Sequence, residues 1–303
     1  MKKNKNSNNM QIQAYIKRSS LAENLKKEIL DPDFMDMNPL FFQNFASLFK
    51  GAFSVTKEQV ELLNIGGFLY FQSIMYLDDV IDEGDLSRLN LILVCQQEGV
   101  KILSSIFGLE NKFWAFWNKR KEEYFQAVVL EKKLFRKQLI AIEEYENLAC
   151  DKHSFLKSCI DSLHCIDNVD KDKYQKLLLS QKYFSVACQL RDDIKDFKED
   201  LRKGQFNWAI YLLQQEKIST QDPEVLEKYF YIRGIADRVC QLGMKYCDKA
   251  LDLVKNINVS EWEMVLAEMK LNFMQIIEEK KDYLELLKAQ IILSNEFVSK
   301  NNS

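Results

Sequence analysis

The sequence predicts an all-α fold, a single large helical bundle, from three features of its composition. The chain has 303 residues, of which 47% are hydrophobic and 29% are charged, enough for one large buried core. It contains 9 glycines and 3 prolines, so residues that break helices are rare. Residues 110–150 contain neither glycine nor proline. These features favour long helices over a sheet-rich fold.

The expected helices are bounded by capping residues, glycines and prolines. Thr56 and Gln59 have the spacing of a capping box, and Asp222-Pro223 and Ser260 mark the starts of later helices. The expected helices cover residues 10–30, 40–49, 57–83, 86–107, 110–150 (one helix, or two with a slight kink), 151–166, 171–203, 208–215, 223–254 and 260–297. Residues 1–10 are polar and are expected to form a disordered tail, with residues 11–303 as one helical domain.

Charge and cysteine content narrow the class of protein. The net charge is −3, from 42 basic and 45 acidic residues, so nothing indicates a nucleic-acid partner. No uncharged run is long enough for a transmembrane segment. The 7 cysteines are scattered singly and no secretory signal precedes them, which predicts reduced thiols in a cytoplasmic protein.

An acidic cluster follows the apolar helix expected over residues 57–83. The sequence there reads Q-S-I-M-Y-L-D-D-V-I-D-E-G-D, and Asp78, Asp79 and Asp82 share one helix face. Like charges at this spacing repel each other by roughly 0.2–0.5 kcal/mol per pair. Solvent or divalent cations must offset this repulsion, and Mg²⁺ prefers carboxylate oxygens together with substrate phosphates.

The same spacing occurs a second time. Residues 189–204 read Q-L-R-D-D-I-K-D-F-K-E-D-L-R-K-G, in which Asp192, Asp193 and Asp196 repeat the pattern of the first cluster. Asp200 lies one turn further along the same face. A single D-D-x-x-D motif in a helical chain is more often a solvated helix end than a metal site. Two copies at corresponding ends of long apolar helices favour metal binding.

Two such helices in a bundle would place their carboxylates at the mouth of a central cavity. Metal ions held there could bind a diphosphate, and the apolar cavity could accept a hydrocarbon chain. This arrangement suits ionisation of an allylic diphosphate, because metals stabilise the departing diphosphate and a dry aromatic cavity shields the carbocation. The candidate lining residues are Phe68, Phe71, Tyr76, Phe113, Trp114, Trp117, Phe155, Tyr183 and Phe184.

The two acidic motifs also carry a family resemblance. L-D-D-V-I-D-E-G-D-L-S-R resembles the first aspartate-rich motif of the trans-isoprenyl diphosphate synthases and related class I terpene synthases, and Q-L-R-D-D-I-K-D resembles the second. The resemblance covers residues 62–211. It implies the isoprenoid synthase fold with a central active-site cavity, an allylic prenyl diphosphate substrate, three Mg²⁺ ions when diphosphate is bound, and a homodimer.

Positions that match the family motifs give individual residues implied roles. The implied metal ligands are Asp78, Asp82, Asp192 and Asp196. The acids beside them, Asp79 and Asp193, complete the implied catalytic set. The groups implied to bind the substrate diphosphate are Arg88, Lys152, Gln189 and Lys203.

Departures from the family pattern bear on the reaction. Chain-elongating members carry a G-G-K-x-x-R-P element that holds isopentenyl diphosphate, and residues 31–63 contain nothing like it. The Arg-Arg pair after the first motif is reduced to Ser87-Arg88. Metal ligands without an acceptor site are typical of a one-substrate enzyme. The sequence therefore favours a Mg²⁺-dependent class I terpene synthase, a lyase of isoprenoid biosynthesis, although the usual N-S-E metal motif of such cyclases is not found.

Three alternatives stay open. The first is a trans-prenyltransferase, a polyprenyl diphosphate synthase with a diverged pocket for isopentenyl diphosphate. The second is a prenyltransferase that uses a peptide or another non-isoprenoid acceptor. The third is a catalytically silent partner subunit, which would not need to retain both acidic clusters.

Overall fold

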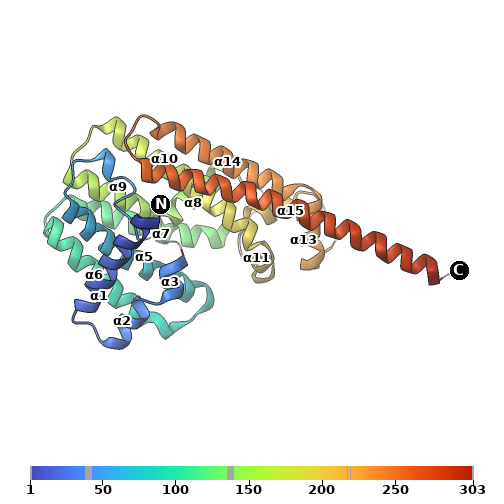
Figure 1. The fold of residues 1–303 in the computed structure, drawn as a ribbon, viewed down its shortest axis with the longest axis horizontal. Helices are drawn as coiled ribbons and strands as arrows, with labels where there is room; N and C mark the ends of the chain where they lie inside the picture. The colour runs from blue at the N-terminus through green and yellow to red at the C-terminus, as the bar shows by residue number, and fades with distance from the viewer. Residues whose placement is uncertain (1, 38–42, 135–139, 217, 219, 302–303) are drawn as a thin grey trace. The chain divides into compact units, whose positions relative to one another are not determined.

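The structure is a computed structural model that describes residues 2–37, 43–134, 140–216, 218 and 220–301, and the side chains of residues 2–7, 82–83 and 287–301 lie outside this description. Every regular element in the described ranges is a helix, and no strand occurs in them (Figure 1). The predicted all-α class is therefore confirmed.

The chain divides into two compact units. Unit 1 comprises Met1–Tyr124, His153–Leu179 and Leu253–Val265. Unit 2 comprises Phe125–Lys152, Ser180–Asp252 and Leu266–Ser303. The helices that contribute residues to both units are α7 (Phe113–Leu134), α10 (Lys171–Lys195), α14 (Ile235–Val254) and α15 (Ser260–Asn301).

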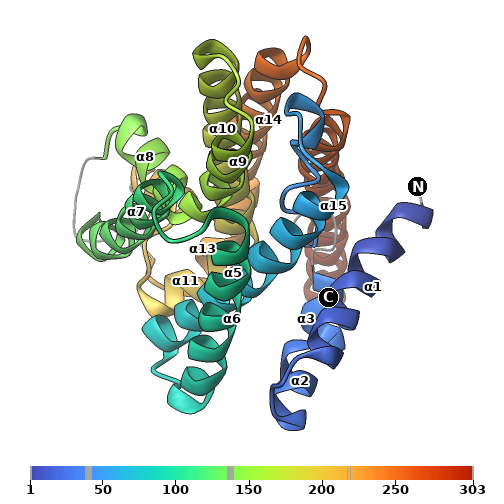
Figure 2. The same cartoon turned by 90° about the vertical axis from the view of Figure 1, so that its left-hand side faces the viewer.

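Unit 1 is built around α5 (Lys57–Glu83), the helix that carries the first acidic cluster. α5 packs along α6 (Leu89–Phe107) and also contacts α1 (Lys2–Arg18) and α9 (Ser154–Ile166) (Figure 2). The α5–α6 pair is close because both helices present glycine, and a Cβ on Gly99 would lie 3.3 Å from the carbonyl oxygen of Gly66. The shorter helices of this unit are α2 (Glu23–Ile29), α3 (Pro32–Met37), η1 (Lys50–Ala52) and η2 (Leu86–Arg88).

Unit 2 surrounds the part of α10 that carries the second acidic cluster. Its other helices are α8 (Ile142–Lys152), α11 (Phe197–Lys203), α12 (Trp208–Gln214) and α13 (Pro223–Ile232). The last three pack against one another, and the rings of Phe197 and Phe230 stack with centroids 4.4 Å apart. Tyr145 on α8 is fully buried, which brings a hydroxyl group into this core.

The predicted helix starts that depend on local capping are confirmed. The backbone N–H of Gln59 donates to Thr56 Oγ1 at 3.2 Å, and the Thr56 N–H donates to Gln59 Oε1 at 2.9 Å, so the capping box is complete. Asp222 accepts from the N–H of Glu224 at 2.9 Å and caps α13. These bonds form between residues a few positions apart, so the sequence predicts them without tertiary information.

Three predicted helices are wrong in length because each is interrupted by one to four residues. The helix expected over residues 10–30 ends at Arg18, where Ser19 Oγ donates to the carbonyl of Ile16 and competes with the helical pattern. The helix expected over residues 171–203 is interrupted at Asp196, which has φ −93° and ψ 6°. The helix expected over residues 223–254 is divided at Gly234, whose φ of +68° is left-handed.

Two further predictions fall partly outside the described residues. For the helix expected over residues 40–49, residues 40–42 lie outside them, and residues 43–49 form turns. For the helix expected over residues 110–150, the chain forms α7 and α8, and residues 135–139 between them lie outside the described part. The predicted tail, residues 1–10, overlaps α1, and its separation from a single domain stays a prediction.

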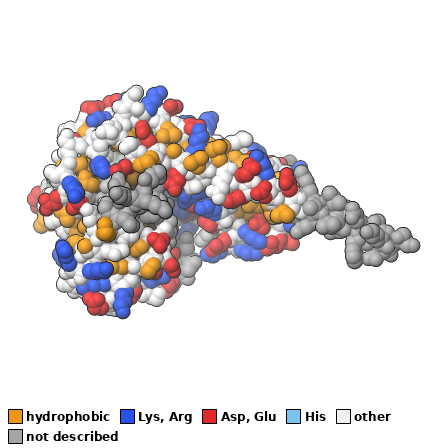
Figure 3. Space-filling model, viewed as in Figure 1, with side chains coloured by type: hydrophobic (Ala, Val, Ile, Leu, Met, Phe, Trp, Pro, Cys, Tyr) orange, Lys and Arg blue, Asp and Glu red, His pale blue; other side chains and the backbone are white. Residues whose placement is uncertain are grey.

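Surface charge, the state of the cysteines and the apolar character of the helices were all subjects of prediction from the composition. On the face drawn in Figure 3, positive and negative side chains are interspersed, in keeping with the small net charge. None of the 7 cysteines, all of which lie in the described ranges, forms a disulfide. None of the described helices combines the length and apolar character needed to cross a membrane.

Candidate functional site

The first acidic cluster occupies the last turns of α5. The helix ends at Gly84, which takes a left-handed φ of +73° and donates its N–H to the carbonyl of Val80 at 3.1 Å. Asp78 is half-buried and Asp79 is exposed. The α5 backbone places Asp82 one turn beyond Asp78, and its side chain is not described. The acids therefore stand at the C-terminal end of a helix, where the helix dipole disfavours negative charge.

A tyrosine on α7 holds the first carboxylate of this cluster. The hydroxyl of Tyr124 donates to Asp78 Oδ1 at 2.9 Å, and the Tyr124 side chain is only 4% exposed. One turn earlier on α7, Arg120 donates from Nε and Nη2 to the two oxygens of Asp161, at 2.7 and 3.2 Å. Both of these charged groups are buried.

Further bonds complete this buried network. Arg120 Nη1 donates to Glu123 at 2.8 Å, and Lys157 Nζ donates to the same carboxylate at 2.9 Å. The hydroxyl of Tyr174 donates to Asp161 at 2.6 Å. Two cations and two carboxylates thus neutralise one another, and the pKa of Glu123 is lowered because the attraction of Lys157 and Arg120 outweighs the opposing effect of its burial.

Arg88 follows the first cluster in η2, where Asp85 caps the turn by accepting from the N–H of Ser87 at 2.9 Å. Its guanidinium lies over the ring of Tyr76, 4.5 Å from the centroid, and the residue is exposed. A cation in this position is available to an anion from solvent while the ring contact orients it.

The second cluster divides into an interior acid and two outward acids. Asp193 is only 2% exposed, and Oδ2 accepts from the hydroxyl of Tyr145 at 2.8 Å and the N–H of Trp208 at 2.9 Å. Its Oδ1 accepts from Gln189 Nε2 at 3.0 Å. Burial raises the pKa of Asp193 to about 7 despite these three donors. Asp193 is thus an acceptor inside the unit 2 core.

Asp192 and Asp196 face outward. The Asp192 side chain is 37% exposed and accepts from Arg191 at 2.8 and 3.0 Å. Asp196 is also exposed, and its pKa is raised by partial burial and by the neighbouring charges of Asp192 and Glu199. Asp200 lies beyond the interruption, where Asn207 Nδ2 donates to its Oδ2 at 2.8 Å and burial raises its pKa to about 6.

The predicted diphosphate-binding groups of unit 2 all contact carboxylates. Lys152 at the end of α8 is half-buried and donates to Glu131 at 2.8 Å. Its charge lowers the pKa of Asp200, against the larger effect of burial, so it lies close to the second cluster. Lys203 pairs with Glu199 at 2.7 Å near the end of α11. Gln189 contacts Asp193, as described above, and lies one helical turn before it.

The aromatic residues predicted to line a cavity pack largely on one another in unit 1. The rings of Phe71 and Phe155 have centroids 5.0 Å apart, and those of Phe113 and Trp117 are 5.6 Å apart. Trp114 donates its indole N–H to the carbonyl of Gly108 at 2.7 Å. Core packing therefore accounts for these rings, in agreement with the burial of Trp117.

The carboxylates of the two clusters are the groups available to a magnesium ion. Within the described residues, no three His, Cys, Asp or Glu side chains are arranged to hold a metal ion. Each cluster instead presents one half-buried and one exposed acid, Asp78 and Asp79 in one case and Asp192 and Asp196 in the other. Mg²⁺ commonly takes one or two protein carboxylates and fills its other positions with water and substrate phosphate. The donors fit that requirement chemically.

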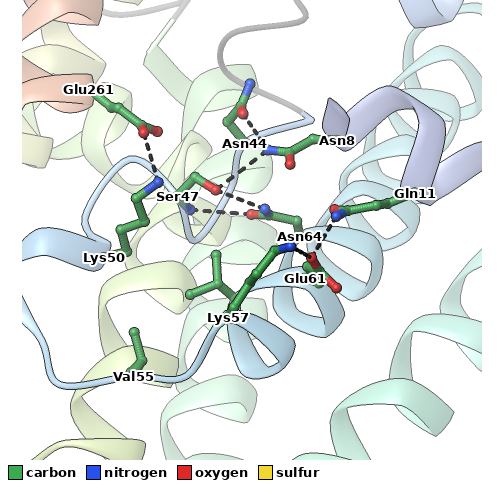
Figure 4. Close-up of a pocket in the computed structure, with 11 residues that line it drawn as sticks. Asn8, Gln11, Asn44, Ser47, Lys50, Val55, Lys57, Glu61, Asn64 and Glu261 are labelled. Atoms are coloured by element: carbon green, nitrogen blue, oxygen red, sulfur yellow. Dashed lines mark hydrogen bonds and ion pairs between the residues drawn. The ribbon is translucent and has the colours of Figure 1, made fainter. Parts of the chain in front are cut away.

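A polar pocket of about 440 Å³ in unit 1 lies away from the acidic cluster (Figure 4). Lys50 in its wall pairs with Glu261 at 2.8 Å, and Lys57 pairs with Glu61 at 3.5 Å. Glu61 precedes Asp78 on α5 by about 25 Å at 1.5 Å rise per residue. This pocket is therefore not part of the site around Asp78.

Sequence reasoning missed the residues that hold the acids. Tyr124 and Tyr145 contact acids 46 and 48 positions away in the sequence. No local pattern identifies such partners. Asn207 had a detectable signal, because it is the N-cap of α12 and accepts from the N–H groups of Ala209 and Ile210.

Comparison with known proteins gives a consistent result for the fold. No protein-family model matches the sequence, and no curated protein sequence matches it. A geranylgeranyl pyrophosphate synthetase from the archaeon Geoglobus acetivorans has a similar structure, with a TM-score of 0.72 and 14% identity over 89% of this chain and 96% of that one. A heptaprenyl diphosphate synthase from Staphylococcus aureus has a TM-score of 0.70 and 16% identity over 90% and 99% of the two chains.

A third similar structure carries ligands. It is a polyprenyl synthase from Caulobacter crescentus CB15 complexed with calcium and isoprenyl diphosphate, with a TM-score of 0.68 and 16% identity over 88% of this chain and 92% of that one. These likenesses extend over 88–90% of this chain. The chain therefore has the helical fold of the trans-isoprenyl diphosphate synthases, the fold of the class I isoprenoid synthase superfamily.

Proposed function

We propose that this chain is a Mg²⁺-dependent enzyme of isoprenoid biosynthesis that acts on an allylic prenyl diphosphate, and that its reaction is that of a trans-prenyltransferase. The observation that carries the proposal is the presence of an outward acidic cluster at the end of both α5 and α10 in this fold. The terpene synthase favoured by the sequence becomes the second candidate, because the similar structures are polyprenyl diphosphate synthases.

The acids account for the metal requirement. Asp78 and Asp82 on α5, and Asp192 and Asp196 at the end of α10, would hold Mg²⁺, with three ions implied by family resemblance when diphosphate is bound. Bound magnesium supplies positive charge that stabilises the departing diphosphate. Like-charge repulsion disfavours the acids of each cluster, and the dipole at the C-terminal end of α5 also disfavours Asp78, so a cation would offset a cost already present in the fold.

The basic residues would orient the diphosphate. Arg88 is exposed and oriented by Tyr76, so it can donate to phosphate oxygens directly. Lys152 and Lys203 would exchange their contacts with Glu131 and Glu199 for phosphate oxygens. Asp193 would act inside the fold, since its oxygens accept from the core and from Gln189. These interactions bind and orient the leaving group before the allylic carbon–oxygen bond breaks.

One observation keeps the terpene synthase as the second candidate. Residues 31–63 contain Lys50 and Lys57 as their only basic residues, and both pair with glutamates. A second diphosphate, that of isopentenyl diphosphate, needs cations to offset its charge. A chain without such cations would ionise a single substrate and then quench or cyclise the carbocation.

The two reactions give different products from the same incubation. The protein is incubated with Mg²⁺ and geranyl, farnesyl or geranylgeranyl diphosphate, each with and without isopentenyl diphosphate, and hydrocarbon and diphosphate products are analysed separately. We expect longer diphosphates that form only with isopentenyl diphosphate, and no product with EDTA. Hydrocarbon or alcohol formed without isopentenyl diphosphate would establish the terpene synthase instead. Failure to turn over any allylic diphosphate would contradict both candidates.

A homodimer is proposed from an apolar stripe. Leu86, Leu89, Leu93 and Val100 are between 39% and 64% exposed, and their spacing places them on one face of η2 and α6. Exposed apolar rows of this kind mark interaction surfaces. Leu93→Glu is expected to convert a dimer to a monomer in light scattering, while Leu109→Glu, an exposed position outside α6, leaves it unchanged. A monomeric wild-type protein at micromolar concentration would contradict this proposal.

A further inference from the structure

The hydrogen bond between Tyr124 and Asp78 joins a buried donor to a less buried acceptor. The donor hydroxyl belongs to a side chain that is 4% exposed, whereas the accepting residue, Asp78, is half-buried. The bond, 2.9 Å long, reaches Oδ1. No described side chain bonds to the other oxygen, Oδ2. A neutral donor at one oxygen fixes the rotamer of a carboxylate without neutralising its charge.

The segment of α7 that carries Tyr124 is itself fixed. Arg120 lies one helical turn before Tyr124, and its bonds to Asp161 join α7 to α9. Glu123, the residue before Tyr124, accepts from Lys157 on α9. These groups are charged and largely buried, so displacing the segment would expose unpaired charges. The bonds between α7 and α9 therefore hold in place the helical segment that carries the Tyr124 hydroxyl.

The second cluster contains a similar bond with a different consequence. Tyr145 donates to Asp193 at 2.8 Å, but both oxygens of Asp193 accept further bonds inside the core. No oxygen there remains directed outward, so that bond secures the fold alone. The two acids differ in this respect, because Asp193 has both oxygens engaged inside the core, whereas Asp78 accepts from a described side chain at Oδ1 alone.

We propose that Tyr124 is a positioning residue for Asp78. Its hydroxyl holds Oδ1 so that Oδ2 is presented to a magnesium ion, and it makes no contact with substrate. This inference rests on the proposed function, because it assumes that Asp78 is a metal ligand. Partners that orient metal-binding carboxylates from behind typically contribute a factor of about 10–100 to metal affinity. Removing the hydroxyl is expected to weaken metal binding by that factor.

The test measures metal binding without turnover. Mg²⁺ is titrated calorimetrically into the full-length protein in the presence of inorganic diphosphate, for wild type and Tyr124→Phe. The matched control is Tyr15→Phe, which removes another bond from tyrosine to a carboxylate in unit 1, 3.1 Å to Glu98 on α6. We expect the apparent Mg²⁺ affinity to fall about 10–100-fold in Tyr124→Phe and to stay unchanged in Tyr15→Phe.

A double-substitution cycle separates positioning from a loss of folding. If Tyr124 acts through Asp78, adding Tyr124→Phe to Asp78→Asn will cause no further loss of affinity. Equal affinities of Tyr124→Phe and wild type would overturn the inference while leaving the proposed function in place. Equal losses in Tyr124→Phe and Tyr15→Phe would also overturn it, because a general structural effect would then explain both. A wild-type protein that binds no Mg²⁺ with diphosphate would overturn the proposed function and this inference together.

Discussion

Asp192→Asn is expected to lower kcat/KM for an allylic diphosphate by a factor of about 10²–10³, the range for removal of one preorganised electrostatic group. Asparagine keeps the shape of the side chain and removes the charge that would hold Mg²⁺. The residue is 37% exposed and bonds to Arg191 beside it, so its loss should leave folding nearly intact. Asp78→Asn is expected to have a similar effect through the first cluster. Rates are measured at saturating Mg²⁺ by diphosphate release.

The control for this experiment is Asp172→Asn. Asp172 is an exposed acid whose partner, Lys176, lies one turn away at 2.6 Å, and it is far in sequence from both clusters. Its replacement should leave kcat/KM unchanged. Wild-type activity of Asp78→Asn or Asp192→Asn would contradict a role for the acidic clusters in the reaction.

Asp161→Ala is expected to destabilise the protein by about 3–5 kcal/mol, the cost of leaving a buried charge without its partner. Asp161 is fully buried and accepts two bonds from Arg120 and one from Tyr174. Its removal leaves the guanidinium with Glu123 as its remaining acidic partner in this network. The midpoint of urea denaturation should fall accordingly.

Asp172→Ala provides the matched comparison for stability. It breaks the exposed pair with Lys176, and exposed pairs of this kind contribute little to stability because solvent screens them. The two substitutions therefore separate a buried ion network from a surface ion pair within unit 1. Similar small shifts of the denaturation midpoint for both variants would show that the Arg120 network contributes little to stability.

Features with local causes could be predicted from the sequence. The capping box of Thr56 and the acidic faces of α5 and α10 depend on residues within one turn, and composition alone indicated the all-α class. Short interruptions of helices were missed. Ser19 and Asp196 are compatible with helices, and the backbone conformations that end helices there depend on surrounding structure.

The residues around the acids could be predicted only in part. Spacing placed Asp192 and Asp193 in the same acidic cluster, but the structure buries Asp193 and leaves the Asp192 side chain 37% exposed. The difference depends on Tyr145 from another helix, and sequence spacing carries no information about that contact. The same limit applies to Tyr124, whose partner is 46 positions away.

The sequence-based preference for a terpene synthase rested on the absence of one motif. Absence of a basic element in residues 31–63 favoured a terpene synthase, whereas the similar folds favour the prenyltransferase alternative. A motif records one way to bind a second diphosphate, and another set of cations elsewhere in the chain could perform the same task. The family resemblance therefore predicted the fold better than the reaction.

The central claim is that each of the two acidic clusters holds metal ions when diphosphate is bound. The most direct test is a crystal structure of the protein with Mn²⁺, which marks magnesium sites by its anomalous signal, and an inert thiolo analogue of farnesyl diphosphate. The account predicts metal peaks in contact with carboxylate oxygens of Asp78 and of Asp192, at about the 2.0–2.1 Å typical of magnesium sites. A diphosphate bound without metal contacts to either aspartate, or metal at only one cluster, would contradict it.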